Sequence, residues 1–312
     1  TTAREWLREA WLDLSDQELA DALSEATGRD ISIYRTTQMR QRLGLKKTRS
    51  GQPVVFEESQ HRRYDSPPVL KTANLLVLAD VEAPLHDAEW CSDVVALAKA
   101  WDVDIVLSAG DLLHFKALSS FFKRFLTDEE QVAELTDEVT AAGDFVGVLL
   151  NEFKEVHCIL GNHENRLTRS LGVNVRTRIL QKLLGYDREP RLNIHPYYFA
   201  EVETGVPLNG MGDRWRVSHP RNTSVIPVRV AGRMADKYEA HYLSAHGHDW
   251  GSVTSAAGRY ASALGICVDP LRLDYYATRD NLRPRMQQGA LILRDGYPYL
   301  LHPEYAPPGR FM

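Results

Sequence analysis

The chain has 312 residues, of which 44% are hydrophobic and 25% are charged, so it can bury a sizeable core and is neither disordered nor fibrous. Its formal net charge of −5 argues against a protein that coats nucleic acid over its whole surface. The 3 cysteines are far apart, which excludes a disulfide framework and a thiolate zinc site. There is no apolar leader and no apolar run of about 18 residues, so we expect a cytoplasmic protein with no membrane contact.

Residues 1–49 are predicted to form a small helical module. Ser15 and Glu18 make a capping-box pattern ahead of apolar residues at helical spacing. A further helix is predicted within residues 34–43 and an earlier one around Trp6 and Trp11, and the stretch from Arg29 to Arg49 is strongly basic. This arrangement is typical of a helix-turn-helix module that binds DNA. The alternative is that the helices pack through their tryptophans and the arginines are only solvated.

Residues 50–73 are predicted to be a linker, because prolines, glycine and charges interrupt any periodicity there. In the second domain, residues 74–312, short apolar runs at 75–79, 103–107 and 155–160 are expected to be buried strands. Helical periodicity separates them, and Thr127 opens the longer helix with a second capping box. Strands that alternate with helices imply parallel pairing and a layered α/β fold.

The later part of this domain is predicted to be richer in β-structure. Residues 214–219, 242–246 and 261–268 have the composition of strands. Asp295-Gly296 lies between two apolar runs and is the expected turn of a hairpin. These segments predict a second sheet.

Residue types that bind metals follow five of the predicted strands. They are Asp80, Asp111, Asn162 with His163, His219, and His246 with His248. The carboxyl ends of parallel strands meet in one crevice, so we expect these side chains to converge. Carboxylate, imidazole and amide groups form a mixed set that suits Mn, Fe, Zn or Ni. One such residue in a loop is usually a solvated surface group, but that interpretation is harder to hold for five positions.

These residues resemble the calcineurin-like metallophosphoesterase family, over roughly residues 74 to 302. The family pattern is D-x-H, G-D, G-N-H-D/E, an isolated H and G-H-x-H. The chain offers, in that order, Asp80-Val81-Glu82, Gly110-Asp111, Gly161-Asn162-His163-Glu164, His219 and Ala245-His246-Gly247-His248. The resemblance implies a layered β-sandwich flanked by helices. The amino-acid sequence around these motifs, from Asp80 to Asp87 and from Gly161 to Arg166, is most similar to that of phage-encoded members. Such an origin would place the protein in the host cytoplasm.

The resemblance also implies two divalent metal ions, with Mn favoured and Fe, Zn or Ni as alternatives. Position by position, the ligands of one ion would be Asp80, Glu82 and His248, those of the other would be Asn162, His219 and His246, and Asp111 would bridge both ions. Two ions clamp a phosphate and activate a bridging hydroxide for in-line attack on phosphorus.

His163 would act as the general acid for the leaving oxygen. Arg166 lies one helical turn beyond Asn162 and is expected to bind a phosphate oxygen, with Arg221 as a weaker candidate. The alternative for each arginine is a surface salt bridge.

The sequence departs from the family pattern at three positions. Glu82 stands where the family has its first His, Ala245 replaces a Gly, and His114 lies where many members carry an Asp. Our hypothesis is an exchange of roles, in which Glu82 binds a metal or orients a neighbour and His114 lies near the phosphate. In the alternatives, Glu82 points away and one ion binds weakly, or His86 substitutes for it.

The favoured function is a metal-dependent phosphoesterase, more specifically a phosphodiesterase acting on a nucleotide or nucleic acid, because the basic N-terminal module suggests such a target. The alternative is a non-catalytic, DNA-associated scaffold or regulator with a weakened metal site. The sequence leaves open which phosphate ester is the substrate and the oligomeric state.

Overall fold

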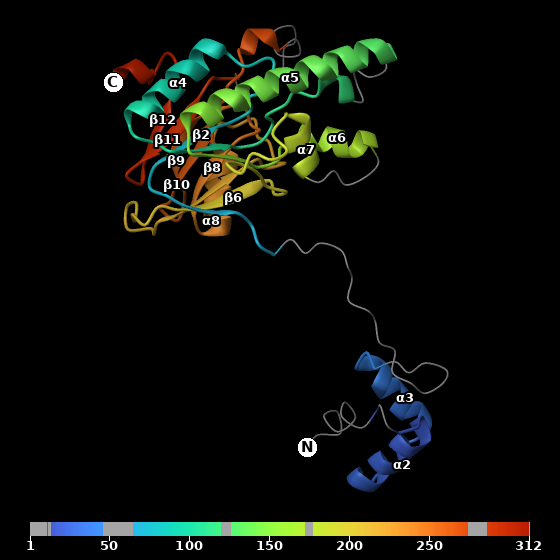
Figure 1. Cartoon of the computed structure of the whole chain (residues 1–312). Helices are drawn as coiled ribbons and strands as arrows, with labels where there is room; N and C mark the ends of the chain where they lie inside the picture. Colours follow the sequence, from blue (N-terminus) through green and yellow to red (C-terminus); the bar gives the residue numbers. More distant parts are fainter. Residues whose placement is uncertain are drawn as a thin grey trace. The chain divides into compact units, whose positions relative to one another are not determined.

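The computed structural model describes residues 11, 14–45, 65–119, 126–171, 177–273 and 286–311. The chain divides into two compact units, Thr1–Tyr64 and Asp65–Met312, and each is treated by itself (Figure 1). Within the described ranges, no helix is both long enough and apolar enough to cross a membrane.

The first unit contains two described helices, α2 (Asp16–Thr27) and α3 (Ile33–Arg42). The predicted capping box forms, because the N–H of Glu18 donates to Ser15 Oγ at 3.2 Å and the N–H of Ser15 donates to Glu18 Oε2 at 2.6 Å. A small core joins the helices, made of Leu19 and Leu23 with Trp11, Leu14, Ile31, Met39 and Leu43 around them. The earlier helix that the sequence predicts around Trp6 lies outside the described residues.

The second unit is built on two six-stranded sheets. The first sheet has the order β12-β11-β2-β3-β4-β5. Its strands are Tyr297–Leu301, Ala290–Arg294, Leu75–Leu78, Ile105–Ser108, Glu155–Cys158 and Leu192–Ile194. Strands β2 to β5 are parallel, while β11 runs antiparallel to both of its neighbours.

The second sheet has the order β1-β6-β7-β8-β10-β9. Its strands are Val69–Lys71, Phe199–Glu203, Arg214–Ser218, His241–Ser244, Tyr260–Leu264 and Trp250–Thr254. Strands β7, β8 and β10 are parallel, so their carboxyl ends lie at the same edge.

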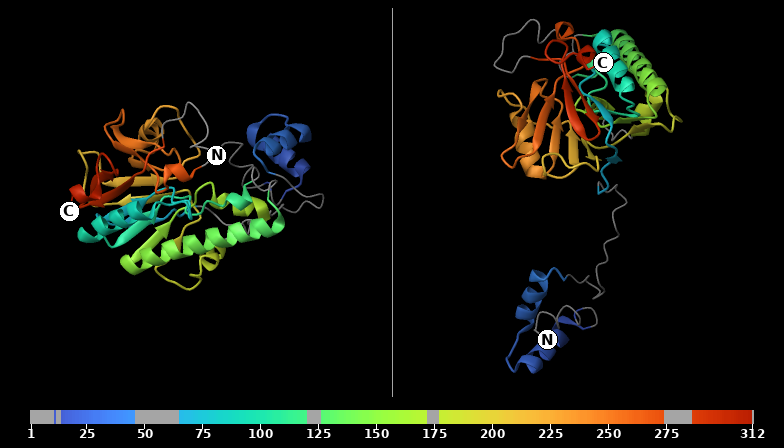
Figure 2. Two further views of the ribbon diagram at one scale, coloured as in Figure 1. Left: turned by 90° about the horizontal axis from the view of Figure 1, so that it is seen from above. Right: turned by 90° about the vertical axis from the view of Figure 1, so that its left-hand side faces the viewer.

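Helices cover the outer faces of both sheets (Figures 1 and 2). Helices α4 (Ala88–Ala100) and α5 (Asp128–Glu152) lie side by side on the first sheet, and α8 (Arg229–Tyr238) packs on β8 and β10 of the second. Two shorter helices, α6 (Glu164–Leu171) and α7 (Thr177–Leu183), follow β4. Single turns of 3₁₀-helix occur at Lys116–Leu118, Pro270–Arg272 and Pro308–Arg310.

The continuous apolar run of β2 is explained by burial on both faces. Leu75 and Val77 point into the core between the two sheets, whereas Leu76 and Leu78 point into the core beneath α4 and α5. Because successive side chains alternate between the faces of a strand, a strand covered on both sides is apolar throughout.

The predicted layered α/β fold with helices at the N-terminus is confirmed. The hairpin turn is also as expected, with Asp295 and Gly296 both at positive φ, 51° and 81°. One assignment needs correction, because Val69–Lys71, which we placed in the linker, forms β1 and pairs with β6. Three residues are too few to show a period of two, and the partner strand is about 130 residues away in the sequence, so no local signal marks this strand.

Candidate metal centre

The polar residues of the family pattern lie just beyond the carboxyl ends of strands from both sheets. Asp80 and Glu82 follow β2, Asp111 and His114 follow β3, and Asn162 and His163 follow β4. From the second sheet, His219 follows β7, and His246 and His248 follow β8. The structure therefore gathers side chains from five strand ends, as the parallel pairing predicted.

Several of these residues adopt the left-handed backbone conformation. The φ angles of Asp80, Glu82, Asp111, His246 and His248 are 49°, 44°, 50°, 70° and 58°. Non-glycine residues rarely take this conformation, and such strain concentrates at functional sites where the surrounding structure enforces it. Here the N–H of Glu82 donates to the carbonyl of Asp111 at 2.8 Å, which ties the turns after β2 and β3 together.

One group of possible metal ligands consists of Asp80, Glu82 and His248. His248 Nε2 lies 3.2 Å from Asp80 Oδ1 and 3.7 Å from Glu82 Oε1. The other oxygen of Asp80 accepts the main-chain N–H of His246 at 3.1 Å. The carboxylate oxygens that face His248, Asp80 Oδ1 and Glu82 Oε1, are buried and make no hydrogen bond to any described residue.

A second group consists of Asp111, His219 and His246, with Asn162 beside it. His219 Nδ1 lies 3.0 Å from the carbonyl of Ala109, which it can donate to, while Nε2 faces Asp111 Oδ2 at 3.2 Å and Asn162 Oδ1 at 3.0 Å. In the neutral ring, Nε2 would then present a lone pair to two oxygens, an arrangement that calls for a cation between them. Burial lowers the pKa of His219, but in the absence of a cation the charge and hydrogen bond of Asp111 and the charges of Asp80 and Glu164 together raise this pKa to about 10.

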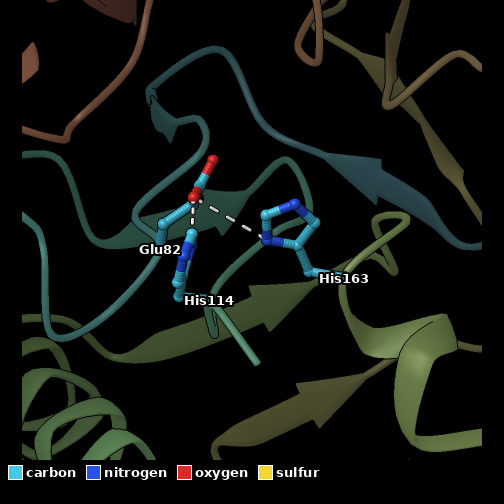
Figure 3. Close-up of side chains that lie close together, drawn as sticks. All are labelled: Glu82, His114 and His163. Atoms are coloured by element: carbon cyan, nitrogen blue, oxygen red, sulfur yellow. Dashed lines mark hydrogen bonds and ion pairs between the residues drawn. The ribbon is translucent and has the colours of Figure 1, made fainter. Parts of the chain in front are cut away.

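A third group places both exchanged residues together with the predicted general acid (Figure 3). His114 Nδ1 lies 2.5 Å from Glu82 Oε2, and His163 Nδ1 lies 3.8 Å from the same oxygen. The two rings meet edge to face with centroids 5.4 Å apart. Burial alone would raise the pKa of Glu82, but His163, His114 and His248 lower it to about 2, so the carboxylate is ionised.

These observations fit divalent metal ions. One oxygen each of the Asp80 and Glu82 carboxylates is buried without a hydrogen-bond partner among the described residues. Burying such groups is costly unless something compensates them, and a metal ion supplies that compensation. The donors are imidazole nitrogens and carboxylate oxygens, the set that Mn, Fe, Zn and Ni accept.

Glu164 has a structural role that sequence reasoning missed. Its buried carboxylate accepts four backbone N–H groups, those of Gly161 at 2.7 Å, Leu112 at 2.9 Å, Asp111 at 3.1 Å and Leu113 at 3.2 Å. Burial, together with the charge of Asp111, nonetheless raises the pKa of Glu164 to about 7. The sequence indicates Glu164 only as the last position of the G-N-H-E motif. Its structural role could not be predicted, because its partners after β3 lie about 50 residues earlier in the chain.

The two arginines that are predicted to bind phosphate, Arg166 and Arg221, differ in their contacts. Arg166 Nη1 donates to the carbonyl of His114 at 2.7 Å, so it braces the turn that carries this histidine. Arg221 is exposed, with its guanidinium carbon 5.9 Å from the centroid of the Tyr198 ring. Neither forms a salt bridge with a described acidic residue, and phosphate binding by either one stays a prediction.

His86 lies apart from the three ligand groups. Its ring packs edge-on against Phe145 with centroids 5.0 Å apart, near the groove between α4 and α5. Its substitution for Glu82 as a ligand therefore has no support in the geometry.

Comparison with known proteins bears on both the fold and the site. A family model described as calcineurin-like phosphoesterase matches residues 73–277. Among solved structures, vacuolar protein sorting 29 from Cryptosporidium parvum matches with 14% identity over 73% of this chain and 95% of that chain, at a TM-score of 0.35. A single mutant of Vps29 from Entamoeba histolytica matches with 13% identity over 73% and 97%, at a TM-score of 0.33. A search of curated proteins finds no match.

Proposed function

The chain belongs to the calcineurin-like phosphoesterase family, and from that premise we propose that it is a metal-dependent phosphodiesterase acting on a nucleotide or nucleic acid. The observation that carries the proposal is the convergence of two ligand groups, one around Asp80 and one around Asp111, with His163 beside both. When bound, two divalent ions, with Mn favoured, would offset the charge of the phosphate and lower the pKa of a coordinated water.

The residues of the chain would then handle the leaving group. His163 Nδ1 is buried and has no hydrogen-bond partner among the described residues, so it is free to donate a proton to the departing oxygen. Burial lowers the pKa of His163, which makes its protonated form a stronger acid. The carboxylates of Glu82 and Asp111, each 3.8 Å from one ring nitrogen, would keep the ring in place.

Hydrolysis of a bis-aryl phosphate and of a mono-aryl phosphate, each with Mn²⁺ and with a chelator, tests this proposal. We expect faster turnover of the diester and loss of both activities with the chelator. Asp111→Asn should remove metal binding and activity together, because the family pattern predicts that this carboxylate bridges both ions. Preference for the monoester, or turnover that persists in the chelator, would contradict the proposal.

A second candidate function is a non-catalytic scaffold or regulator associated with DNA. It is favoured by the contact between Glu82 and His114, because that contact engages one oxygen of a predicted ligand. On this hypothesis the protein hydrolyses neither aryl phosphate but still binds DNA.

We further propose that the first unit binds duplex DNA through α3. One face of this helix packs on α2, and there the buried Arg40 forms an ion pair with the partly exposed Asp16 at 3.1 Å. The opposite face carries Tyr34, which is 71% exposed, next to Arg35 and Arg42. These side chains border a groove of about 780 Å³, and no acidic residue of the described part of this unit lines it. Arginine is the commonest reader of guanine in the major groove.

Arg35→Ala and Arg42→Ala, combined in the full chain, test the DNA proposal. If both arginines contact phosphates, the slope of log affinity for duplex DNA against log salt concentration should fall by about 2. Lys71→Ala, at an exposed position of β1, is the control. An unchanged slope would instead support packing or solvation of these arginines.

A further inference from the structure

The outer helix of the second sheet carries an unpaired basic face. Arg229, Arg233 and Lys237 recur every four residues along α8 and are all exposed. Among the residues that the structure describes, none of the three has an acidic partner. Like charges at this spacing destabilise an isolated helix by about 0.2–0.5 kcal/mol per pair. The row of cations therefore does not serve to stabilise α8.

The acidic residue of the same helix is already engaged elsewhere. Asp236 accepts from the hydroxyl of Ser255 at 2.5 Å and from the N–H groups of Ala256 and Ala257 at 3.2 and 3.0 Å. Its charge is therefore held at the turn between β9 and β10. The three cations are left to face solvent.

A groove of about 450 Å³ runs beside this basic face, and we call it the α8 groove. It is lined by Arg229, Arg233 and Lys237 together with Asn222, Thr223, Ser224, Val230 and Met234. Three cations, two hydroxyls and one amide are donors for phosphate oxygens, while the two apolar side chains offer contact for the uncharged part of a nucleotide. Among the residues that the structure describes, no carboxylate lines the groove, although the chain as a whole has a net charge of −5.

The α8 groove begins next to the candidate metal centre. Asn222 lies three residues after His219, and α8 runs antiparallel to β8, so its first residue lies at the same end as His246 and His248. The N–H of Val228, the residue before α8, donates to Asp249 Oδ2 at 2.6 Å. A smaller cavity shares Asn222, Ser224 and Val230 with the groove and is also lined by Asp249 and by Gly247, which lies between the two histidines in the sequence. From there the cations lead away along the helix, about 6 Å per step of four residues.

We infer that the α8 groove holds the strand of a single-stranded nucleic acid on one side of the scissile phosphodiester. This inference rests on the proposed phosphodiesterase function and gives it a substrate class, a polyanion rather than a small cyclic or monomeric phosphate. The three cations that line the groove lie in one row along α8. A row of cations that follows a backbone is the usual way to bind a single strand without reading its sequence.

The test compares two triple variants of the full chain. The first combines Arg229→Ala, Arg233→Ala and Lys237→Ala. The second, matched control combines Lys71→Ala, Arg188→Ala and Arg310→Ala, which removes the same charge from exposed positions in segments that carry no residue of the three ligand groups. Alanine favours a helix at least as much as arginine or lysine does, so α8 should persist, and the melting temperature checks this.

Binding is measured by fluorescence anisotropy of a labelled oligothymidylate in chelator, across a range of salt concentrations. We expect the slope of log affinity against log salt to fall by about 2 in the α8 variant, because each phosphate contact in a single strand contributes about 0.7. Affinity at low salt should fall about tenfold or more, with the control variant unchanged. Equal slopes and affinities for the two variants, or no binding by the wild type, would overturn the inference.

Measurements of turnover distinguish a failure of the α8 inference from a failure of the proposed phosphodiesterase function. With Mn²⁺, kcat/KM for the oligonucleotide should fall about tenfold or more in the α8 variant, whereas kcat/KM for the bis-aryl phosphate should stay within about twofold. A wild type that binds the oligonucleotide through α8 yet hydrolyses no diester would contradict the phosphodiesterase proposal alone. A wild type that hydrolyses both substrates, with an α8 variant that matches the control on both, would contradict the α8 inference alone.

Discussion

At the scale of single residues, Glu82 determines how this centre differs from the family pattern. One of its carboxylate oxygens contacts His114 at 2.5 Å, and the other faces His248 at 3.7 Å without a hydrogen bond to a described residue. The side chain is fully buried and points into the site rather than away from it. This geometry allows one carboxylate both to bind a metal and to orient an imidazole, and the exchange of roles between Glu82 and His114 stays a prediction.

We predict that Glu82→Ala lowers the affinity for one metal ion by at least about 100-fold and leaves the other ion bound. Loss of even an outer partner of a metal ligand costs about 10- to 100-fold in affinity, and loss of a ligand should cost no less. Metal content after gel filtration is the measurement. Glu138→Ala is the matched control, since Glu138 is a buried carboxylate that belongs to none of the ligand groups. Two ions at wild-type affinity would show that Glu82 is not a ligand.

A carboxylate in place of imidazole should also shift the preference among metals. Oxygen ligands favour harder ions, so we expect Glu82→His to retain activity while the ratio of Mn²⁺ to Zn²⁺ affinity falls. Because Asp80, Glu82 and Asp111 repel one another without a cation, added Mn²⁺ should raise the melting temperature of the wild type. It should raise that of Glu82→Ala by less.

His163→Ala is predicted to lower kcat by about 10²–10⁴ while metal content stays at the wild-type level, because a positioned general acid typically contributes that much. His163 also lies in the group with Glu82 and His114, so a ligand role is the competing interpretation. Loss of metal from the variant would favour that interpretation over the catalytic one.

At the scale of elements, the turns that follow the strands determine the site, and they are held by close backbone contact. A Cβ on Gly161 would lie 2.0 Å from Asp111 Oδ1 and 2.3 Å from Asp111 N. Glu164, at the start of α6, binds the backbone of both turns. Through its Gly and its Glu, the motif G-N-H-E thus brings the turns after β3 and β4 into contact.

Gly161→Ala should therefore lower the free energy of unfolding by about 1–3 kcal/mol, the usual cost of overpacking, and should abolish activity by displacing Asn162 and His163. Urea denaturation and diester hydrolysis are the measurements. Gly309→Ala is the control, since a Cβ added at Gly309 would have nothing within 4 Å and the φ of this residue is ordinary. Wild-type activity in the Gly161 variant would mean that these turns tolerate a shift.

At the scale of the whole molecule, we expect His195, a half-buried histidine outside the metal centre, to make the stability of the second unit depend on pH. His157 lies in β4, where its Nε2 is 3.0 Å from Glu155 and its Nδ1 is 3.0 Å from His195 Nε2. The rings of His157 and His195 stack with centroids 5.3 Å apart. Burial, and then the neighbouring His157, lower the pKa of His195 from 6.5 to about 4.

Because the folded-state pKa is the lower one, the unfolded chain binds a proton at His195 between about pH 6.5 and pH 4 that the folded chain does not. Stability from this residue is therefore complete above about pH 6.5 and is lost as the pH falls through that window. We expect His195→Gln to reduce the fall in unfolding free energy between pH 7 and pH 5 by about 1 kcal/mol, a figure discounted for partial exposure. Urea midpoints at the two pH values are the measurement, and equal falls in variant and wild type would contradict the assignment.

The sequence by itself determined the elements whose signals are local. The capping boxes at Ser15 and Thr127 form as predicted, and the apolar runs of β2, β3 and β4 are strands. It also placed metal-binding residue types at strand ends, because the end of an apolar run and the polar residue after it are neighbours in the chain. The order of strands and helices then sufficed to predict that those ends converge.

Only the tertiary structure decided which side chains face one another. Residues about 30 to 130 positions apart are joined in the pairing of Glu82 with His114, in the bonds from Glu164 to three N–H groups after β3, and in the pairing of the edge strand β1. The α8 groove is a further case, since its cations have no acidic partner among the described residues. Periodicity and spacing report what a residue has beside it in the chain, whereas charge, hydrogen bonding and ligation depend on distances of a few ångströms that the packing of the two sheets alone sets.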